Sequence, residues 1–333
     1  MTINISLLTA GYVIQASDRR MVMLDTRGRL TSSIKDDANK GVIVNAEDGQ
    51  FAITFAGIGM YNGKFMDQWL AELAATEGVV ELPIEVGVEI IAEHATKLFE
   101  RIRNVPKQHA FSIAGYRNDG KTVAPHLWVV SNTDLGFVPD SSTATKDHFS
   151  VQHFVVEKPG RGLAMIIGAH QSIDRAGRRR LDAAIRNRQL DGVETALVEV
   201  IRMGASKSEF AQIINGEVLT VSLTQNGLAR STFHPSADPV ENYAPWVVWH
   251  EANQNFVAGN AKLGLARGIA YQFGPGLFVP GMDGSGARDD GSGEAGLWFR
   301  PYEAKFKTDE PNPGNVRIFG VVPISAATAG HKP

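Results

Sequence analysis

The threonine at position 2 is the residue of this sequence best suited to covalent chemistry. Methionine aminopeptidases remove an initiator methionine that precedes a small residue, so Met1 is a candidate for removal. Removal would leave Thr2 with a hydroxyl nucleophile and a free α-amine that can take the hydroxyl proton. Because an α-amine titrates near ~8 in model peptides, part of it is neutral at physiological pH. The sequence therefore predicts Thr2 as a nucleophile.

Two further charged residues could tune that amine. Asp18 follows the second expected strand, and Lys40 directly precedes the third one. A lysine beside the α-amine would lower the pKa of the amine by like-charge repulsion, and an aspartate would hold the lysine in place. Lys35 is the alternative lysine, because it lies nearer to Asp18 in the sequence. Lys40 is preferred because it directly precedes a strand.

Alternating apolar residues predict the elements that would position these groups. A tight antiparallel hairpin is expected first, and a second pair of strands ends at Ala56-Gly57. The strands expected in this region cover 3–8, 12–16, 41–44 and 51–55.

Helix pairs and strands alternate along the rest of the chain as far as residue 235. Helices are expected over 64–76, 84–102 and 192–203, with an arginine-rich helix after residue 170, and strands over 110–116, 125–131, 162–170 and 218–223. The polar segment 139–158 is expected to be an inserted loop with a short strand. This order predicts an α+β protein, a four-layer αββα sandwich of two antiparallel sheets flanked by helix pairs.

Several of these features occur together in one known family. Thr2, the motif Ala16-Ser17-Asp18-Arg19-Arg20, Lys40 and Phe55-Ala56-Gly57 together resemble the proteasome-type N-terminal nucleophile (Ntn) hydrolases. This family includes proteasome β subunits, the ring protease HslV and the bacterial homologue Anbu. Sixteen residues separate Thr2 from Asp18, which is the interval that the family uses. The interval from Lys40 to Gly57 is more similar to that of Anbu-type members.

The resemblance implies a role for each residue of the motif. Thr2 would be the nucleophile, Lys40 would tune its amine, and Asp18 would hold Lys40. The Gly57 amide would donate a hydrogen bond to the developing oxyanion. Phe55, directly before the Ala-Gly turn, would line the pocket that selects the substrate side chain.

Two stretches depart from the family pattern. Active members carry a serine between glycines at a strand-to-helix turn, where this chain has Gly168-Ala169-His170. They also carry an aspartate and a serine before the last strand, whereas residues 211–217 contain neither. His170 and Asn215 are the candidates to substitute. Three hypotheses therefore remain open: a threonine peptidase, a catalytically inactive ring-forming scaffold, and an amidohydrolase that acts on a small amide.

The resemblance also implies partners and a division of the chain. A self-compartmentalised ring of identical subunits, acting on a peptide substrate, is expected, and an unfoldase partner is left open. No cofactor and no metal are expected. Residues 1–235 are expected to form the proteasome-like Ntn-hydrolase domain, and residues 236–333 a C-terminal extension that is partly β.

Composition limits the remaining function classes. The chain has 333 residues, a formal net charge of −3, no cysteine and 43 % hydrophobic residues, which is ample for a sizeable core. The absence of cysteine excludes disulfide scaffolds, cysteine nucleophiles and zinc–thiolate sites. No basic leader and no apolar run of membrane-spanning length is visible, so a cytoplasmic protein without a membrane partner is expected.

Arginines gather in one segment after residue 170. The cluster consists of Arg175, Arg178, Arg179, Arg180, Arg186 and Arg188. Apolar residues interleave with them at helical spacing, so a solvated helix face is the preferred interpretation and an anionic partner is the alternative. A nucleic-acid partner is not expected, because the chain as a whole is not basic.

Overall fold

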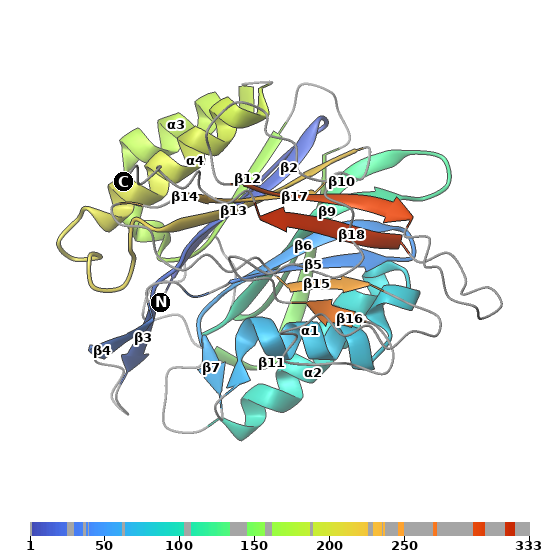
Figure 1. Cartoon of the computed structure of the whole chain (residues 1–333). Coiled ribbons are helices and arrows are strands. Elements are labelled where there is room, and N and C mark those ends of the chain that lie inside the picture. The colour runs from blue at the N-terminus through green and yellow to red at the C-terminus, as the bar shows by residue number, and fades with distance from the viewer. Residues whose placement is uncertain are drawn as a thin grey trace, which may run out of the picture.

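A computed structural model describes most of the chain as far as residue 236 and four strands beyond it. The described residues are 2–24, 30–35, 38, 40–61, 64–102, 108–133, 145–156, 162–186, 189–225, 229–234, 236, 246–249, 269–271, 296–303 and 317–323. The expected alternation of strands and helix pairs is confirmed by the order of elements along the chain (Figure 1).

The first large sheet contains both ends of the described chain. Its seven strands run in the order β12-β1-β2-β13-β14-β17-β18, and every neighbouring pair is antiparallel. The strands are β1 (Ile3–Thr9), β2 (Tyr12–Asp18), β12 (Gly162–Gly168), β13 (Val218–Thr224), β14 (Ala229–His234), β17 (Gly296–Glu303) and β18 (Arg317–Pro323).

The second large sheet has the strand order β11-β10-β9-β6-β5-β15-β16. Its pairs are antiparallel except β5 with β15, so the expectation of two antiparallel sheets is wrong for this one pair. The strands are β5 (Gly41–Ala46), β6 (Gly49–Ala56), β9 (Ala110–Asn118), β10 (Val123–Thr133), β11 (Thr145–Val155), β15 (Trp246–Trp249) and β16 (Ile269–Tyr271). Two small hairpins are β3 (Met21–Leu24) with β4 (Leu30–Lys35), and β7 (Met60–Tyr61) with β8 (Lys64–Phe65).

Four α-helices and two short 3₁₀ helices complete the described elements. They are α1 (Met66–Thr76), η1 (Val79–Glu81), α2 (Ile84–Arg101), η2 (His170–Ser172), α3 (Arg175–Arg186) and α4 (Leu190–Ala205). Helix α2 follows Pro83, whose fixed φ suits a helix start, and buries Ile84, Val88 and Ile91 along one face.

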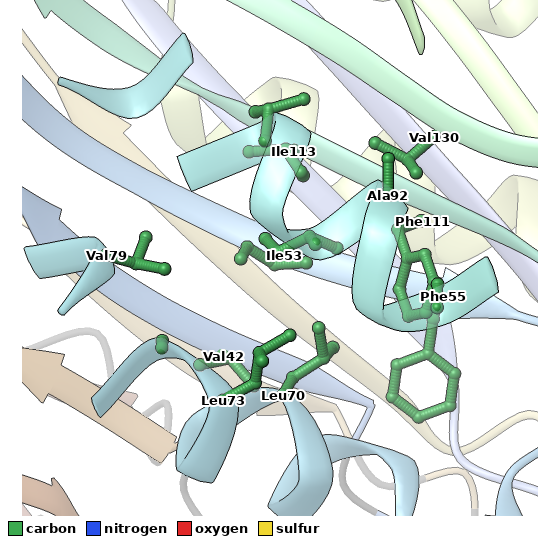
Figure 2. Close-up of a cluster of buried hydrophobic side chains, with 14 of the residues drawn as sticks. Val42, Ile53, Phe55, Leu70, Leu73, Val79, Ala92, Phe111, Ile113 and Val130 are labelled. Carbon is green, nitrogen blue, oxygen red and sulfur yellow. The ribbon is translucent and has the colours of Figure 1, made fainter. Parts of the chain in front are cut away.

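Alternation along the strands divides the core into three clusters. Residues of β1 that face α3 and α4 include Ile3 and Ile5, whereas Leu8 faces the second sheet. Helices α1 and α2 cover the other face of that second sheet (Figure 1). Figure 2 shows this last cluster, the helix-side cluster between the second sheet and helices α1 and α2, where Leu70 of α1 packs near Val42. The α+β class, with two sheets packed face to face and helices on them, is confirmed.

Strand β11 corrects one local expectation. It covers eleven residues of a segment that was expected to be a loop with a short strand. The segment is polar because β11 is the edge strand of its sheet and is only half covered. Phe149 and Val151 supply the apolar contacts to the helix-side cluster, and a strand with so few apolar residues leaves a weak sequence signal.

The strands beyond residue 236 extend both sheets. Strands β15 and β16 follow β5 in the second sheet, and β17 and β18 follow β14 in the first. The division of the chain at residue 235 stays a prediction.

The helix-side cluster generates a stability prediction. Replacing Phe111 by alanine removes a fully buried ring and is expected to lower the free energy of unfolding by about 3–5 kcal/mol. Urea unfolding followed by circular dichroism measures this change. The control is Val86→Ala on α2, where the side chain is 45 % exposed and the expected change stays within about 0.5 kcal/mol. Equal losses in the two variants would contradict the assigned core.

Candidate active site

The antiparallel pairing of β1 with β2 brings position 2 next to position 18. Asn4 lies opposite Ser17, so the start of β1 meets the end of β2. The Asp18 carboxylate is fixed by two backbone donors. Oδ1 accepts the Ile3 N–H at 2.9 Å, and Oδ2 accepts the Arg20 N–H at 3.0 Å. The backbone therefore orients the carboxylate through both of its oxygens.

Thr2, Asp18 and Lys40 contact one another in a buried cluster. The Thr2 hydroxyl donates to Asp18 Oδ1, and the Lys40 ammonium donates to Thr2 Oγ1. Lys40 Nζ also lies 3.1 Å from Asp18 Oδ1 and 2.7 Å from the Arg20 carbonyl oxygen. Thr2 is 3 % exposed and Lys40 is 2 % exposed. Sequence distances of 16 and 38 residues from Thr2 are thus closed by the fold.

Burial sets the electrostatics of the cluster. Loss of water contact lowers the pKa of Lys40, and the charge and hydrogen bond of Asp18 offset only part of that shift. The charges of Arg19 and Arg20 lower the Lys40 pKa further. Lys40 can therefore release its proton at a lower pH than a solvated lysine can.

The turn after β12 holds the backbone of Thr2. The Ala169 N–H donates to the Thr2 carbonyl oxygen at 2.7 Å. Gly168 has φ +87°, and a Cβ built there would overlap the same carbonyl oxygen and lie 3.0 Å from Cβ of Ala56. Glycine is needed for both reasons. The end of β6 and the start of β1 therefore meet at this turn.

Gly57, the expected oxyanion donor, directly follows that end of β6. Its φ is +128°, and a Cβ there would lie 2.6 Å from His109 Nδ1. His109 Nδ1 accepts the Ile58 N–H at 3.0 Å and so fixes the peptide that follows Gly57. The role of the Gly57 amide as an oxyanion donor stays a prediction.

His109 was not found by the sequence reasoning. It is buried, and loss of water contact lowers its pKa to about 3, so the ring is neutral and Nδ1 stays an acceptor. Rings of Phe99 and Phe111 lie 4.9 and 4.4 Å from its centre. A lone histidine between a helix and a strand matches no sequence motif. Its role in supporting the turn at Gly57 follows only from their contact in the structure.

Phe55 lies inside the helix-side cluster. Its ring is 2 % exposed and stacks on His109 with 6.0 Å between ring centres. Its expected role in a substrate pocket stays a prediction. The alternative lysine, Lys35, is the last residue of β4, and its side chain lies outside the described part of the structure.

The two candidate substitutes for the missing family residues contact backbone groups that neighbour the cluster. Asn215 Oδ1 accepts the Arg19 N–H at 3.0 Å, and the Glu217 carbonyl oxygen accepts the same N–H at 3.1 Å. Asn215 therefore supports the peptide next to Asp18. His170 lies with Nδ1 3.3 Å from the Gly168 carbonyl oxygen, at the turn that holds Thr2.

The described part of the chain lacks two features. They contain no group of three or more histidine, aspartate or glutamate residues placed to hold a metal ion. None of the helices that the structure describes has both the length and the apolarity to cross a membrane.

Comparison with known proteins adds a resemblance. No family model and no curated protein matches the sequence. Similar solved structures include Anbu from Hyphomicrobium sp. strain MC1, with 10 % identity over 71 % of this chain and 89 % of that one, and a TM-score of 0.46. Anbu (ancestral beta-subunit) from Yersinia bercovieri has 9 % identity over 72 % and 89 %, and a TM-score of 0.45.

A third similar structure is a helical assembly of the Anbu complex from Pseudomonas aeruginosa. It has 10 % identity over 71 % of this chain and 88 % of that one, and a TM-score of 0.44. These proteins are of the group that the sequence motifs resemble. Because identity and TM-score are low, the chemistry proposed below rests on the contacts of Thr2, Asp18 and Lys40.

Gly168 offers a test of the turn that holds Thr2. The change Gly168→Ala is expected to lower the free energy of unfolding by at least about 1–3 kcal/mol, because it adds a clash to a strained φ. Gly11→Ala is the control, since no atom lies within 4 Å of its built Cβ. Denaturant titration compares the two. If both alanines are tolerated equally, the turn does not constrain Thr2.

His109 generates a prediction on pH and stability. Its folded pKa of about 3 is below the ordinary value of 6.5, so between these values the unfolded chain binds more protons. The contribution of His109 to the free energy of unfolding is therefore fully present above pH 6.5 and is lost as the pH falls toward about 3. The slope of this loss is up to about 1.4 kcal/mol per pH unit.

The comparison of wild type with His109→Asn isolates this contribution. Asparagine keeps an acceptor for the Ile58 N–H but does not titrate, so the variant is expected to show the shallower loss of stability between pH 6.5 and 4. Unfolding free energies from urea titrations at several pH values measure both curves. Parallel curves would mean that His109 is not neutral and buried.

Proposed function

We propose that the chain is an N-terminal threonine hydrolase that becomes competent when Met1 is removed. The observation that carries this proposal is the buried contact of the Lys40 ammonium with both the Thr2 hydroxyl and the Asp18 carboxylate. A cation beside the hydroxyl stabilises the alkoxide that develops as the proton leaves, and a dry site strengthens this interaction.

The proposed reaction starts at the Thr2 hydroxyl. Its Oγ1 attacks the carbonyl carbon of an amide, and the free α-amine of Thr2 takes the hydroxyl proton. The amide C–N bond then breaks, and the same amine gives the proton to the leaving nitrogen. An ester between Thr2 and the acyl group remains, and one water molecule hydrolyses it to a carboxylic acid and free Thr2.

The surrounding residues would support each stage. The charge of Lys40 lowers the pKa of the α-amine, and Asp18 holds Lys40. The Gly57 N–H donates to the oxyanion of the tetrahedral intermediate. The resemblance assigns Phe55 to the pocket for the substrate side chain.

The finer parts of the proposal are predictions from the sequence. They are the four-layer αββα Ntn-hydrolase fold, peptides as substrates, a ring of identical subunits and a cytoplasmic location. They assign the hydrolysis to a compartment that the subunits enclose.

A second candidate function is a proteasome-like scaffold without catalysis. It is favoured by Ala169, which stands where active family members carry serine, and by the absence of aspartate and serine from residues 211–217. The residues that orient the nucleophile in the family would then be missing, and a loosely held site loses most of its rate.

The mass of the intact protein tests the first requirement. The expected mass is that of the chain without Met1, because a threonine follows it. If Met1 is retained, Thr2 has no free amine, and the proposed mechanism is ruled out in favour of the scaffold.

Replacing Thr2 tests the chemistry. We expect Thr2→Ala to lower peptide or amide turnover at least about 1,000-fold, as loss of a covalent nucleophile does, while Thr2→Ser retains part of it. Turnover is measured on a panel of fluorogenic peptides and small anilides, which also separates a peptidase from an amidohydrolase. Mass spectrometry after treatment with a peptidyl electrophile checks for an adduct on Thr2.

The matched control is Thr122→Ala, in the β9–β10 turn far along the chain from the cluster. Thr122 is exposed, and its hydroxyl donates to the Asp119 carboxylate within the same turn. Turnover should therefore not change. A wild type that neither turns over any substrate nor forms an adduct leaves the scaffold as the function.

A further inference from the structure

Helix α3 and the segment that contains α1 and α2 carry opposite charges. The segment 66–101, which contains α1 and α2, has eight acidic and two basic residues, a formal charge of −6. Helix α3 has five arginines and one aspartate, a formal charge of +4. The two groups cover different sheets and lie on opposite outer sides of the molecule (Figure 1).

The positions of the arginines in α3 destabilise the helix that carries them. Arg175, Arg178 and Arg179 are exposed neighbours at spacings of three and four residues, where like charges destabilise a helix by about 0.2–0.5 kcal/mol per pair. Arg175 and Arg178 also lie in the first turn, where the helix dipole disfavours cations. Among the described contacts of these five arginines, only Arg180 has an ion pair, with Glu199. An anionic partner would offset these costs.

A groove on α2 has the chemistry to accept an arginine. It lies between α2 and β11 with a volume of about 330 Å³, and Val86, Ile90 and Phe149 are among its lining residues. Glu89 and Glu93, one helical turn apart, line it as well. Apolar walls suit the methylene stem of arginine, and the Glu89 carboxylate suits its N–H donors. Glu93 already pairs with Lys97 and adds to the negative charge of the rim.

We propose that the arginine face of α3 on one copy docks in the α2–β11 groove of a second copy. A second copy is the partner because each copy presents both a basic face on α3 and an acidic groove on α2, which are complementary in charge. The surfaces lie on opposite sides, so a pair of copies cannot satisfy both contacts reciprocally. The contact is therefore head-to-tail and adds copies in one direction, as a closed ring or an open stack.

This inference rests on the self-association proposed above and does not depend on hydrolysis. It names the surfaces that make the contact, Arg179 on α3 and Glu89 on α2 among them. Both side chains are exposed, and neither contributes to the Thr2 cluster. Like-charged helices facing each other, α3 on α3 or α2 on α2, are disfavoured by the same charges.

Charge reversal on the full-length processed protein tests the contact. Sedimentation velocity over a range of protein and NaCl concentrations measures association of wild type, Arg179→Glu, Glu89→Arg and the double variant. The wild type is expected to self-associate and to dissociate as salt increases. Each single reversal should weaken association at least about 10-fold, as loss of a close interfacial charge pair does. The double variant should recover it, because the pair is restored with exchanged signs.

Glu100→Arg is the matched control. It makes the same change of charge on the same exposed side of α2, outside the residues that line the groove, and should leave association unchanged. Circular dichroism of each variant shows whether the fold is kept.

Three results would overturn the inference. A wild type that is monomeric at every concentration removes the proposed self-association as well, while the test of Thr2 stands. Association that none of the reversals alters rejects only these two surfaces. Copurified nucleic acid that Arg179→Glu releases and Glu89→Arg does not would assign the arginine face to nucleic acid instead.

Discussion

A lysine side chain with almost no exposed surface must have its charge balanced inside the protein, and Lys40 has that balance in Asp18. The fold supplies it by fixing the Asp18 carboxylate with the backbone N–H groups of Ile3 and Arg20. Burial of Lys40 therefore depends on correct pairing of β1 with β2 and on the approach of β5. The Thr2 hydroxyl contacts both charged groups of this cluster. The position of the candidate nucleophile therefore depends on the same strand pairing that buries Lys40.

Backbone geometry, more than side-chain identity, fixes the position of the candidate nucleophile. Gly168 lets the turn after β12 approach the Thr2 carbonyl, and Gly57 lets the end of β6 approach His109. Both glycines have positive φ, which other residues adopt only with strain. The two turns lie at neighbouring strand ends, because a Cβ on Gly168 would meet Ala56. Helix α3 and the segment 66–101, by contrast, place opposite formal charges on the two outer sides of the molecule.

Much of the fold could be predicted because its signals are periodic. Helix α2 shows an apolar stripe that one face of a helix explains, and β1 alternates between two clusters. Strand β11 was not predicted at its full length, because an edge strand buries few apolar side chains. The parallel pairing of β5 with β15 escaped because it joins residues about 200 positions apart, and no local pattern specifies such a partner.

The candidate site divides in the same way. The sequence by itself determined which residues could do chemistry, because a threonine after Met1, an aspartate after one strand and a lysine before another are local features. Only the tertiary structure decided that these groups meet, that Lys40 is dry enough for its pKa to fall, and that His109 supports the Gly57 turn. Contact and desolvation depend on residues that are distant in sequence, and a linear pattern holds no record of them.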